Sequence, residues 1–207
     1  MVRRKLIGLL VCILMVGLAP FAWALIPDPD LSSATTVATE QVSVFSIPDG
    51  SGDALNDARV FGGGRTDATV TLTVVDDAMT PIFNYPAEDM WIESDTPDIV
   101  LCPDGSIADA NTDANGQTTF SQALKVGLNG AGLVVVINSD PLTQEPLDFL
   151  FNSPDMSGDL VVNLTDIVLF ADIYFSAYGY AADYYWDGVV NLSDIVLLAQ
   201  GIGTACP

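Results

Sequence analysis

The sequence predicts a mostly β protein, an antiparallel β-sandwich followed by a small α module of two calcium-binding loop–helix repeats. The first observation is a duplication near the C-terminus, where Asp155–Asp166 and Asp183–Asp194 share one pattern and both continue into Ile-Val-Leu. The second is a series of short β-rich runs, separated by turn residues, that precedes the duplication. We therefore expect a signal peptide at 1–24, the β-sandwich at 27–147 and the metal-binding module at 152–204.

The N-terminus has the composition of a secretory signal. Arg3, Arg4 and Lys5 are positively charged, Leu6–Leu18 is apolar, and Ala22-Trp-Ala24 offers small residues where a signal peptidase cleaves. We expect cleavage after Ala24 and a secreted or cell-surface protein with no stable membrane span. The apolar run is short for a transmembrane helix, although an uncleaved N-terminal anchor is an alternative.

Charge narrows the range of partners. The 207 residues include 6 basic and 27 acidic side chains and no histidine. Removal of the signal would leave three basic residues, Arg59, Arg65 and Lys125, against 27 acidic ones, a net charge of −24. Such a surface repels nucleic acid and anionic lipid and suits a protein that binds cations. Without histidine the chain lacks the commonest general base and the commonest transition-metal ligand.

Two cysteines follow the signal, Cys102 and Cys206. The signal implies an oxidising compartment, where we expect the pair to form a disulfide. Such a bridge would tie the C-terminal tail to the β-sandwich. Two unrelated thiols, or a bridge to another chain, are the alternatives.

The first part of the mature chain reads as strands and turns. Thr69–Val75 alternates polar and apolar residues, which is the period of a half-buried strand. The Asn115-Gly116 pair is a hairpin signal. No long helical period appears, so an antiparallel sandwich is the natural solution. Further strand-like runs lie at 42–47, 90–93, 99–102, 118–122 and 133–137.

Part of this region resembles the bacterial Ig-like domains of invasin- and intimin-type surface proteins. The resemblance lies in the Thr/Val strand Asp67–Asp76 and in the strand entry Thr112–Phe120. The usual Gly-Asn-Pro turn after the first strand is here Ala78-Met-Thr-Pro81. The resemblance implies a spacer or binding module rather than a catalyst.

A connector containing Pro141, Pro146 and Pro154 is expected before the duplicated module. Each acidic repeat then runs into an apolar stretch of helical length, and no helix of useful length precedes either repeat. The arrangement is therefore loop-then-helix, half an EF-hand, twice.

The repeats have the ligand spacing of EF-hand calcium loops. Carboxylates occupy positions 1, 5 and 12 of a twelve-residue frame, and Asn occupies position 9. Calcium takes six to eight oxygen ligands, so we expect one ion in each loop. The predicted ligands of the first loop are Asp155, Ser157, Asp159, the carbonyl of Val161, Asn163 and Asp166. Those of the second loop are Asp183, Asp187, the carbonyl of Val189, Asn191 and Asp194.

Each loop departs from the ideal pattern once. Position 6 usually holds a glycine, which makes the sharp turn of the loop. The first loop has Leu160 at this position, and the second loop has Gly188. A non-glycine residue with positive φ there costs about 1 kcal/mol. Position 3 of the second loop is Tyr185, whose phenol is a poor calcium ligand. We therefore expect weaker binding than in a full consensus loop.

A metal-free alternative treats the loops as ordinary helix caps. Asn163 and Asn191, or the following Thr165 and Ser193, would then be N-caps. That alternative does not explain the acids at positions 1 and 5. The two Asn residues also head glycosylation sequons, but burial in metal loops opposes that modification.

The duplicated pattern D-x-x-x-D-x-V-V-N-L-[ST]-D-I-V-L resembles the type I dockerin module. The resemblance covers residues ~152–203 and implies docking to a cohesin-like module, in a context of polysaccharide breakdown. It implies partner contacts at Leu164 and Thr165 and, equivalently, at Leu192 and Ser193, which would allow docking in either of two orientations.

Two other functions are compatible with the sequence. In the first, the calcium module has no external partner and packs on its own Ig-like domain, as part of a self-contained cell-surface or structural protein. In the second, the chain is a glycoside hydrolase using a carboxylate pair, with Glu88, Asp89 and Glu93 near Trp91 as candidates. Such pairs arise by chance in an acidic chain, so we expect no catalytic residues.

Overall fold

The structure is a computed structural model that describes residues 26–207. The expected signal peptide at 1–24 and its cleavage site lie outside these residues. The described chain is mostly β, with twelve strands, two α-helices and three short 3-10 turns. The predicted β class, followed by two helices, is confirmed.

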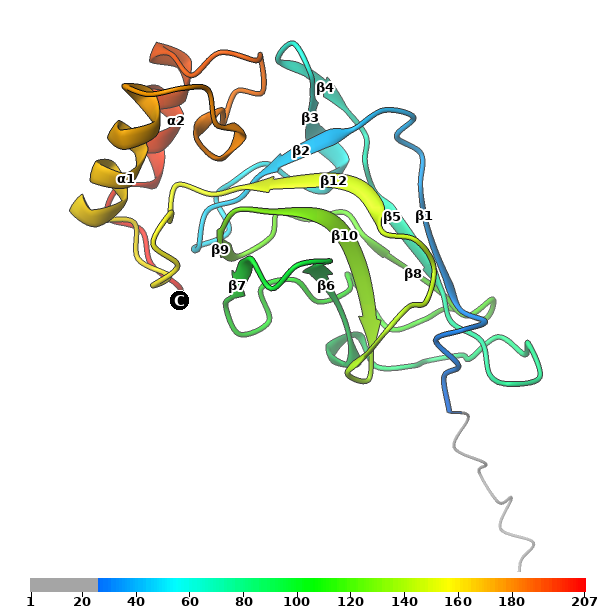
Figure 1. Cartoon of the computed structure of the whole chain (residues 1–207). Helices are drawn as coiled ribbons and strands as arrows, with labels where there is room; N and C mark the ends of the chain where they lie inside the picture. The colour runs from blue at the N-terminus through cyan, green and yellow to red at the C-terminus, as the bar shows by residue number, and fades with distance from the viewer. Residues whose placement is uncertain (1–25) are drawn as a thin grey trace, which may run out of the picture.

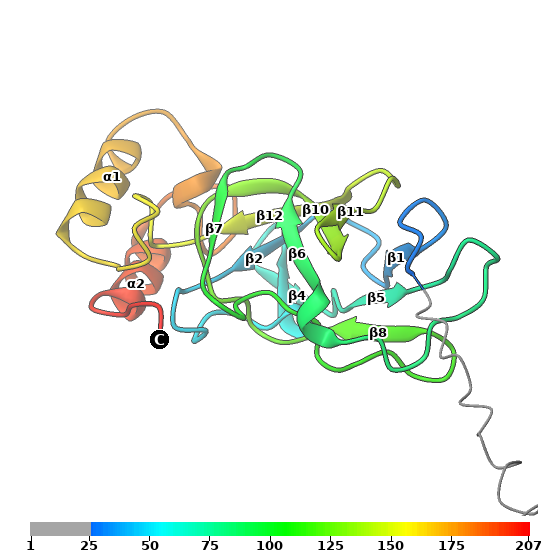
Figure 2. The same ribbon diagram turned by 90° about the horizontal axis from the view of Figure 1, so that it is seen from below.

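Two main sheets enclose one core (Figures 1 and 2). The smaller, antiparallel sheet has the order β1 (Ser33–Thr36), β5 (Val70–Thr73), β8 (Gln117–Phe120). The larger sheet has the order β11 (Asp140–Pro141), β10 (Gly130–Ile137), β12 (Leu147–Asn152), β2 (Val42–Phe45), β3 (Ala58–Val60), β4 (Gly64–Thr66), and β6 (Met90–Ser94) also pairs with β10. A separate pair is formed by β7 (Ile99–Leu101) and β9 (Val126–Leu128).

The core is built from strand faces with a period of two. In β5, Val70 and Leu72 are fully buried while Thr71 and Thr73 are partly exposed, so the alternation predicted for this strand is confirmed. The Asn-Gly turn also forms, with Gly116 at φ 72°. It leads directly into β8, but the segment before it is irregular rather than a full strand.

The C-terminal end of the β region differs from the sequence-based boundary. We expected the sandwich to end at residue 147 and a proline-containing connector to follow. Instead Leu147–Asn152 forms β12, which pairs antiparallel with β10 and parallel with β2 in the middle of the larger sheet. Phe149 and Phe151 are buried there, so burial of this apolar run outweighs the nearby prolines. The sheet is therefore not purely antiparallel, and it extends to Asn152.

We call residues 26–152 the β module and residues 153–207 the C-terminal module. The C-terminal module contains α1 (Leu164–Tyr174) and α2 (Leu192–Gly201), which lie together beside one end of the β module (Figures 1 and 2). Ser153 and Pro154 are buried at the junction. The two modules consequently meet without an exposed linker.

A second hydrophobic core joins the two modules. Phe45, from β2, and Ile47, just after it, supply the contribution of the β module. The ring of Tyr184 lies between Phe45 and Phe170, with centroid distances of 5.4 Å and 5.7 Å. Because β2 sends Val44 into the first core and Phe45 into the second, one strand serves both. The remaining buried members of the second core are Ala182, Leu197 and Leu198.

The predicted disulfide is confirmed. Cys102 and Cys206 are bonded, with their Cα atoms 5.8 Å apart and a sequence separation of 104. The bridge ties the end of the C-terminal module to the segment after β7. No helix among residues 26–207 has the length and apolar character needed to cross a membrane.

Candidate metal-binding loops

The first acidic loop wraps its own backbone around two carboxylates. Asp155, at position 1, accepts hydrogen bonds from the backbone N–H groups of Gly158 (2.8 Å) and Leu160 (2.9 Å). Asp166, at position 12, accepts from the N–H groups of Ser157 (2.8 Å) and Asn163 (2.8 Å). The carboxylate at the start of α1 thus closes the loop that begins at Asp155.

The second loop repeats this frame. Asp183 accepts from the N–H groups of Asp187 (3.2 Å) and Gly188 (2.9 Å). Asp194 accepts from the N–H groups of Tyr185 (2.8 Å) and Asn191 (2.8 Å). The position-12 aspartates of the two repeats therefore have the same partners, the N–H groups of positions 3 and 9, whereas the position-1 aspartates share only the N–H of position 6.

The four carboxylates at positions 1 and 12 are buried without a cationic partner. Asp155, Asp166, Asp183 and Asp194 each have 0% exposure. The ion pairs within residues 26–207 join Arg59 and Arg65 to other acids and do not reach the loops. A buried carboxylate without a counter-charge is costly, and the backbone N–H groups that bond to these four carboxylates offset part of that cost.

Burial also raises the pKa of two carboxyl groups in the loops, one in each loop. Desolvation raises the pKa of the Asp155 carboxyl, and the neighbouring carboxylates of Asp166 and Asp159 raise it further. Desolvation likewise raises the pKa of the Asp194 carboxyl, assisted by Asp183 and Asp187. In both cases hydrogen bonds from the backbone act in the opposite direction.

The donor set of the first loop fits calcium. Asp155, Asp159 and Asp166 each offer a carboxylate oxygen, and these oxygens lie within 4.8 Å of one another. The Ser157 hydroxyl lies 3.3 Å from the Asp155 carboxylate, in the same group. All of these donors are oxygens, which hard cations such as calcium prefer.

The second loop is less convergent. Within the described chain, its three carboxylates do not offer oxygens that all lie within 4.8 Å of one another. Asp183 instead accepts a hydrogen bond of 2.9 Å from the hydroxyl of Tyr178. Tyr185, at position 3, faces the β module, with its ring centre 5.2 Å from the guanidinium carbon of Arg59. The sequence predicts that each loop binds more weakly than a full consensus loop, and the difference between the two loops is seen only in the structure.

The position-9 asparagines are helix caps. The side-chain oxygen of Asn163 accepts from the N–H of Thr165 (2.8 Å), and Asn191 accepts from Ser193 (2.8 Å). Each asparagine also has its own N–H bonded to the position-12 aspartate, which completes a capping box. Their amide nitrogens donate to the position-7 carbonyls of Val161 and Val189, both at 3.1 Å. The caps and the acidic frame thus occur together, and ligation by either asparagine would pass through water.

Both loops turn through a left-handed backbone at positions 4 and 6. In the first loop these are Gly158 (φ 75°) and Leu160 (φ 63°). In the second they are Trp186 (φ 60°) and Gly188 (φ 87°). Leu160 therefore has the positive φ expected from the sequence. Trp186 was not anticipated, although comparison with Gly158 at the same position of the other repeat would have revealed it.

The positions implied as partner contacts are accessible. Leu164 is 72% exposed and Leu192 is 69% exposed, one in the first turn of each helix. Thr165 is exposed and Ser193 is partly exposed. The helices pack on the β module through their other faces. Leu164 and Leu192 therefore remain accessible to a partner while the two modules are in contact.

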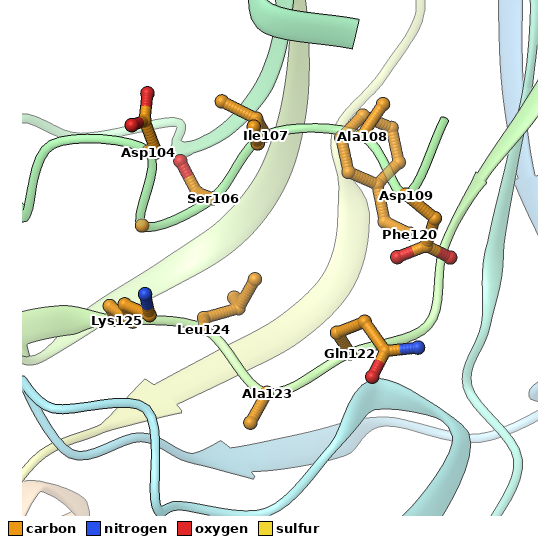
Figure 3. A pocket seen from close by; sticks show the side chains of 11 residues that line it. Asp104, Ser106, Ile107, Ala108, Asp109, Phe120, Gln122, Ala123, Leu124 and Lys125 are labelled. Atoms are coloured by element: carbon orange, nitrogen blue, oxygen red, sulfur yellow. The ribbon is translucent and has the colours of Figure 1, made fainter. Parts of the chain in front are cut away.

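A hollow of about 250 Å³ lies on the β module, and none of its lining residues belongs to the acidic loops (Figure 3). Its lining includes the apolar side chains of Phe120 and Leu124, and its carboxylates, Asp104 and Asp109, lie apart along one segment of the chain. The sequence candidates for glycosidase chemistry, Glu88, Asp89 and Glu93, do not line it. Glu93 accepts a hydrogen bond from the indole N–H of Trp91 (2.7 Å).

Comparison with known proteins leaves the family open. No protein-family model matches the chain, and no curated protein matches it. Among solved structures, the chain has a likeness to the Lin-41 filamin domain at a TM-score of 0.32 and 12% sequence identity, covering 61% of this chain and 96% of that one. At that TM-score the likeness supports no conclusion about function.

Proposed function

We propose that this chain is a secreted, non-catalytic modular protein whose C-terminal module binds two calcium ions and docks to a partner protein. The observation that carries the proposal is the pair of related loops, each enclosing two fully buried carboxylates that have no cationic partner among residues 26–207. A divalent cation would neutralise these charges and bind the position-5 carboxylate as well.

The chemistry of the donors favours calcium over other metals. The predicted side-chain donors are carboxylate, hydroxyl and amide oxygens, and the chain contains no histidine. Calcium accepts six to eight oxygens in a flexible arrangement, whereas magnesium demands a near-ideal octahedron. The first loop, with the more convergent carboxylates, is the better candidate for tight binding.

The exposed start of each helix supports the docking role. Leu164 and Leu192 project from equivalent positions, and Val168 and Val196, one turn later, are each 53% exposed. Apolar side chains displayed in this way on a strongly acidic protein suit a protein interface. The dockerin resemblance suggests a cohesin-like partner, a polysaccharide-degrading context and docking in either of two orientations.

The alternative is a self-contained protein in which the calcium module only packs on its own Ig-like β module. The second core, formed around Phe45 and Tyr184, and the Cys102–Cys206 bridge favour this alternative. The disulfide also supports an oxidising, extracellular location. The exposure of Leu164 and Leu192 favours docking in addition to packing.

Calorimetric titration of the chelator-stripped mature protein with calcium tests the proposal. We expect two ions per chain, with the first loop binding more tightly. Absence of calcium uptake would refute the proposed function. Binding of two ions without any partner interaction by a cohesin-like module would favour the self-contained alternative.

A further inference from the structure

The second acidic loop is fastened to the turn between β3 and β4. The carbonyl of Trp186 accepts hydrogen bonds from the backbone N–H groups of Gly62 (2.8 Å) and Gly63 (3.1 Å). The indole of Trp186 meets the ring of Phe61 edge-on, with centroids 6.0 Å apart. A turn of the β module and a loop of the C-terminal module therefore form one contact surface.

Position 3 of this loop is part of the same surface. In the first loop, position 3 is Ser157, whose hydroxyl lies beside the acid cluster. In the second loop it is Tyr185, whose ring covers the guanidinium of Arg59. Arg59 is only 3% exposed and donates from Nε to Asp53 at 2.7 Å. A position that supplies a ligand in one repeat thus contacts the β module in the other.

The backbone of the second loop also needs support. Trp186 has φ 60°, a left-handed conformation that costs roughly 1–2 kcal/mol for a non-glycine residue. The first loop has Gly158 at the same position and avoids this cost. Because the Trp186 carbonyl and indole are both held by the β3–β4 turn, the contacts with that turn offset the strain.

We propose that the β3–β4 turn is a positioning element of the second calcium site. It fixes Tyr185 and Trp186, and with them the backbone between Asp183 and Asp187, so that less of the loop has to be ordered when its carboxylates close on an ion. The inference rests on the proposed calcium-binding function and deepens it. Pre-ordering a loop before its ligand arrives raises affinity, because less conformational entropy is lost on binding. The first loop, whose hydrogen bonds in the described structure do not involve this turn, would bind calcium independently of it.

Two neighbouring glycines provide a matched test. Gly62 and Gly63 both have positive φ, 93° and 77°, so an alanine at either position introduces a similar backbone strain. A Cβ on Gly63 would lie 2.5 Å from Cε1 of Tyr185 and would displace that ring. A Cβ on Gly62 would have no other atom within 4 Å. Both variants keep the N–H groups that bond to Trp186.

Calcium titration of the mature protein, followed by calorimetry and by tryptophan fluorescence, gives the readout. We expect Gly63→Ala to weaken one of two sites by roughly tenfold relative to Gly62→Ala, a change of about 1.4 kcal/mol, because only the Gly63 variant displaces the ring of Tyr185. In an Asp194→Ala background, which retains only the first site, Gly63→Ala should have no further effect.

The outcomes separate this inference from the proposed function. Equal calcium affinities in Gly63→Ala and Gly62→Ala, with two ions bound by wild type, would overturn the positioning role alone. A loss confined to the first site would overturn it as well. A wild-type protein that takes up no calcium would overturn both proposals.

Discussion

Leu160 and Gly188 occupy the same position of the two acidic loops and share a left-handed backbone, with φ angles of 63° and 87°. Only glycine adopts this conformation without a steric cost. The first loop is therefore built with strain that the second loop avoids at this position. At position 4 the roles are exchanged, since Gly158 precedes Leu160 and Trp186 precedes Gly188.

Replacement of Leu160 isolates this strain. We predict that Leu160→Gly is more stable than Leu160→Ala by about 1 kcal/mol, because both remove the side chain but only glycine relieves the positive φ. Chemical denaturation of the two variants, in calcium and in chelator, measures the difference. An alanine variant as stable as the glycine variant would show that the backbone at this position is not strained.

The acids at position 12 should each control one ion. We predict that Asp166→Ala and Asp194→Ala each reduce calorimetric stoichiometry from two calcium ions to one, since each removes the carboxylate that closes its loop. Asp172→Ala is the matched control, because Asp172 is an exposed acid on α1 outside the loop. Two ions retained in either loop variant would contradict the ligand assignment.

The disulfide should contribute strongly to stability. The bridge joins two residues that are 104 positions apart in sequence. For a closed loop of this length the chain-entropy model gives nearly 5 kcal/mol of stabilisation as an upper figure. We predict that the Cys102→Ser, Cys206→Ser double variant loses about 2–5 kcal/mol of unfolding free energy. Reduction of the wild type should lower its melting temperature to that of the variant. A reductant-insensitive melting temperature would argue against the bridge.

Docking should depend on the start of both helices. We predict that the double variant Leu164→Asp, Leu192→Asp abolishes binding to a cohesin-like module, while each single variant retains binding through the other repeat. Phe175→Asp is the control, because Phe175 is 84% exposed but lies at the far end of α1. Surface plasmon resonance in calcium measures the effect. Full binding by the double variant would place the interface elsewhere or remove the docking role.

The acidic loops were predictable because their register is fixed by sequence spacing alone. The twelve-residue loop itself brings positions 1 and 12 together. Asp155 and Asp166 therefore accept hydrogen bonds from backbone N–H groups of the same loop. The helix starts followed from the same frame, since the asparagine at position 9 caps each helix. Local chemistry was sufficient for these features.

The contacts between modules were not predictable in this way. β12 lies among prolines and is recognisable as a strand only through its pairing with β2 and β10, which are distant in sequence. The sequence did not predict the contact between Phe45 and Tyr184, because it does not indicate which core a buried aromatic residue joins. From the sequence, Tyr185 is only a poor calcium ligand at position 3. In the structure its ring contacts Arg59, and no periodicity in the sequence indicates that contact.

The most direct test of the central claim is the melting curve of the mature protein with calcium and with chelator. Ligand that binds only the folded state adds RT ln(1 + [L]/Kd), about 2.7 kcal/mol for each site at a hundredfold excess over Kd. Because the second core and the disulfide join the modules, we predict that calcium shifts the melting of the whole protein upward. A melting curve that is identical in calcium and in chelator would contradict the assignment of these loops as calcium sites.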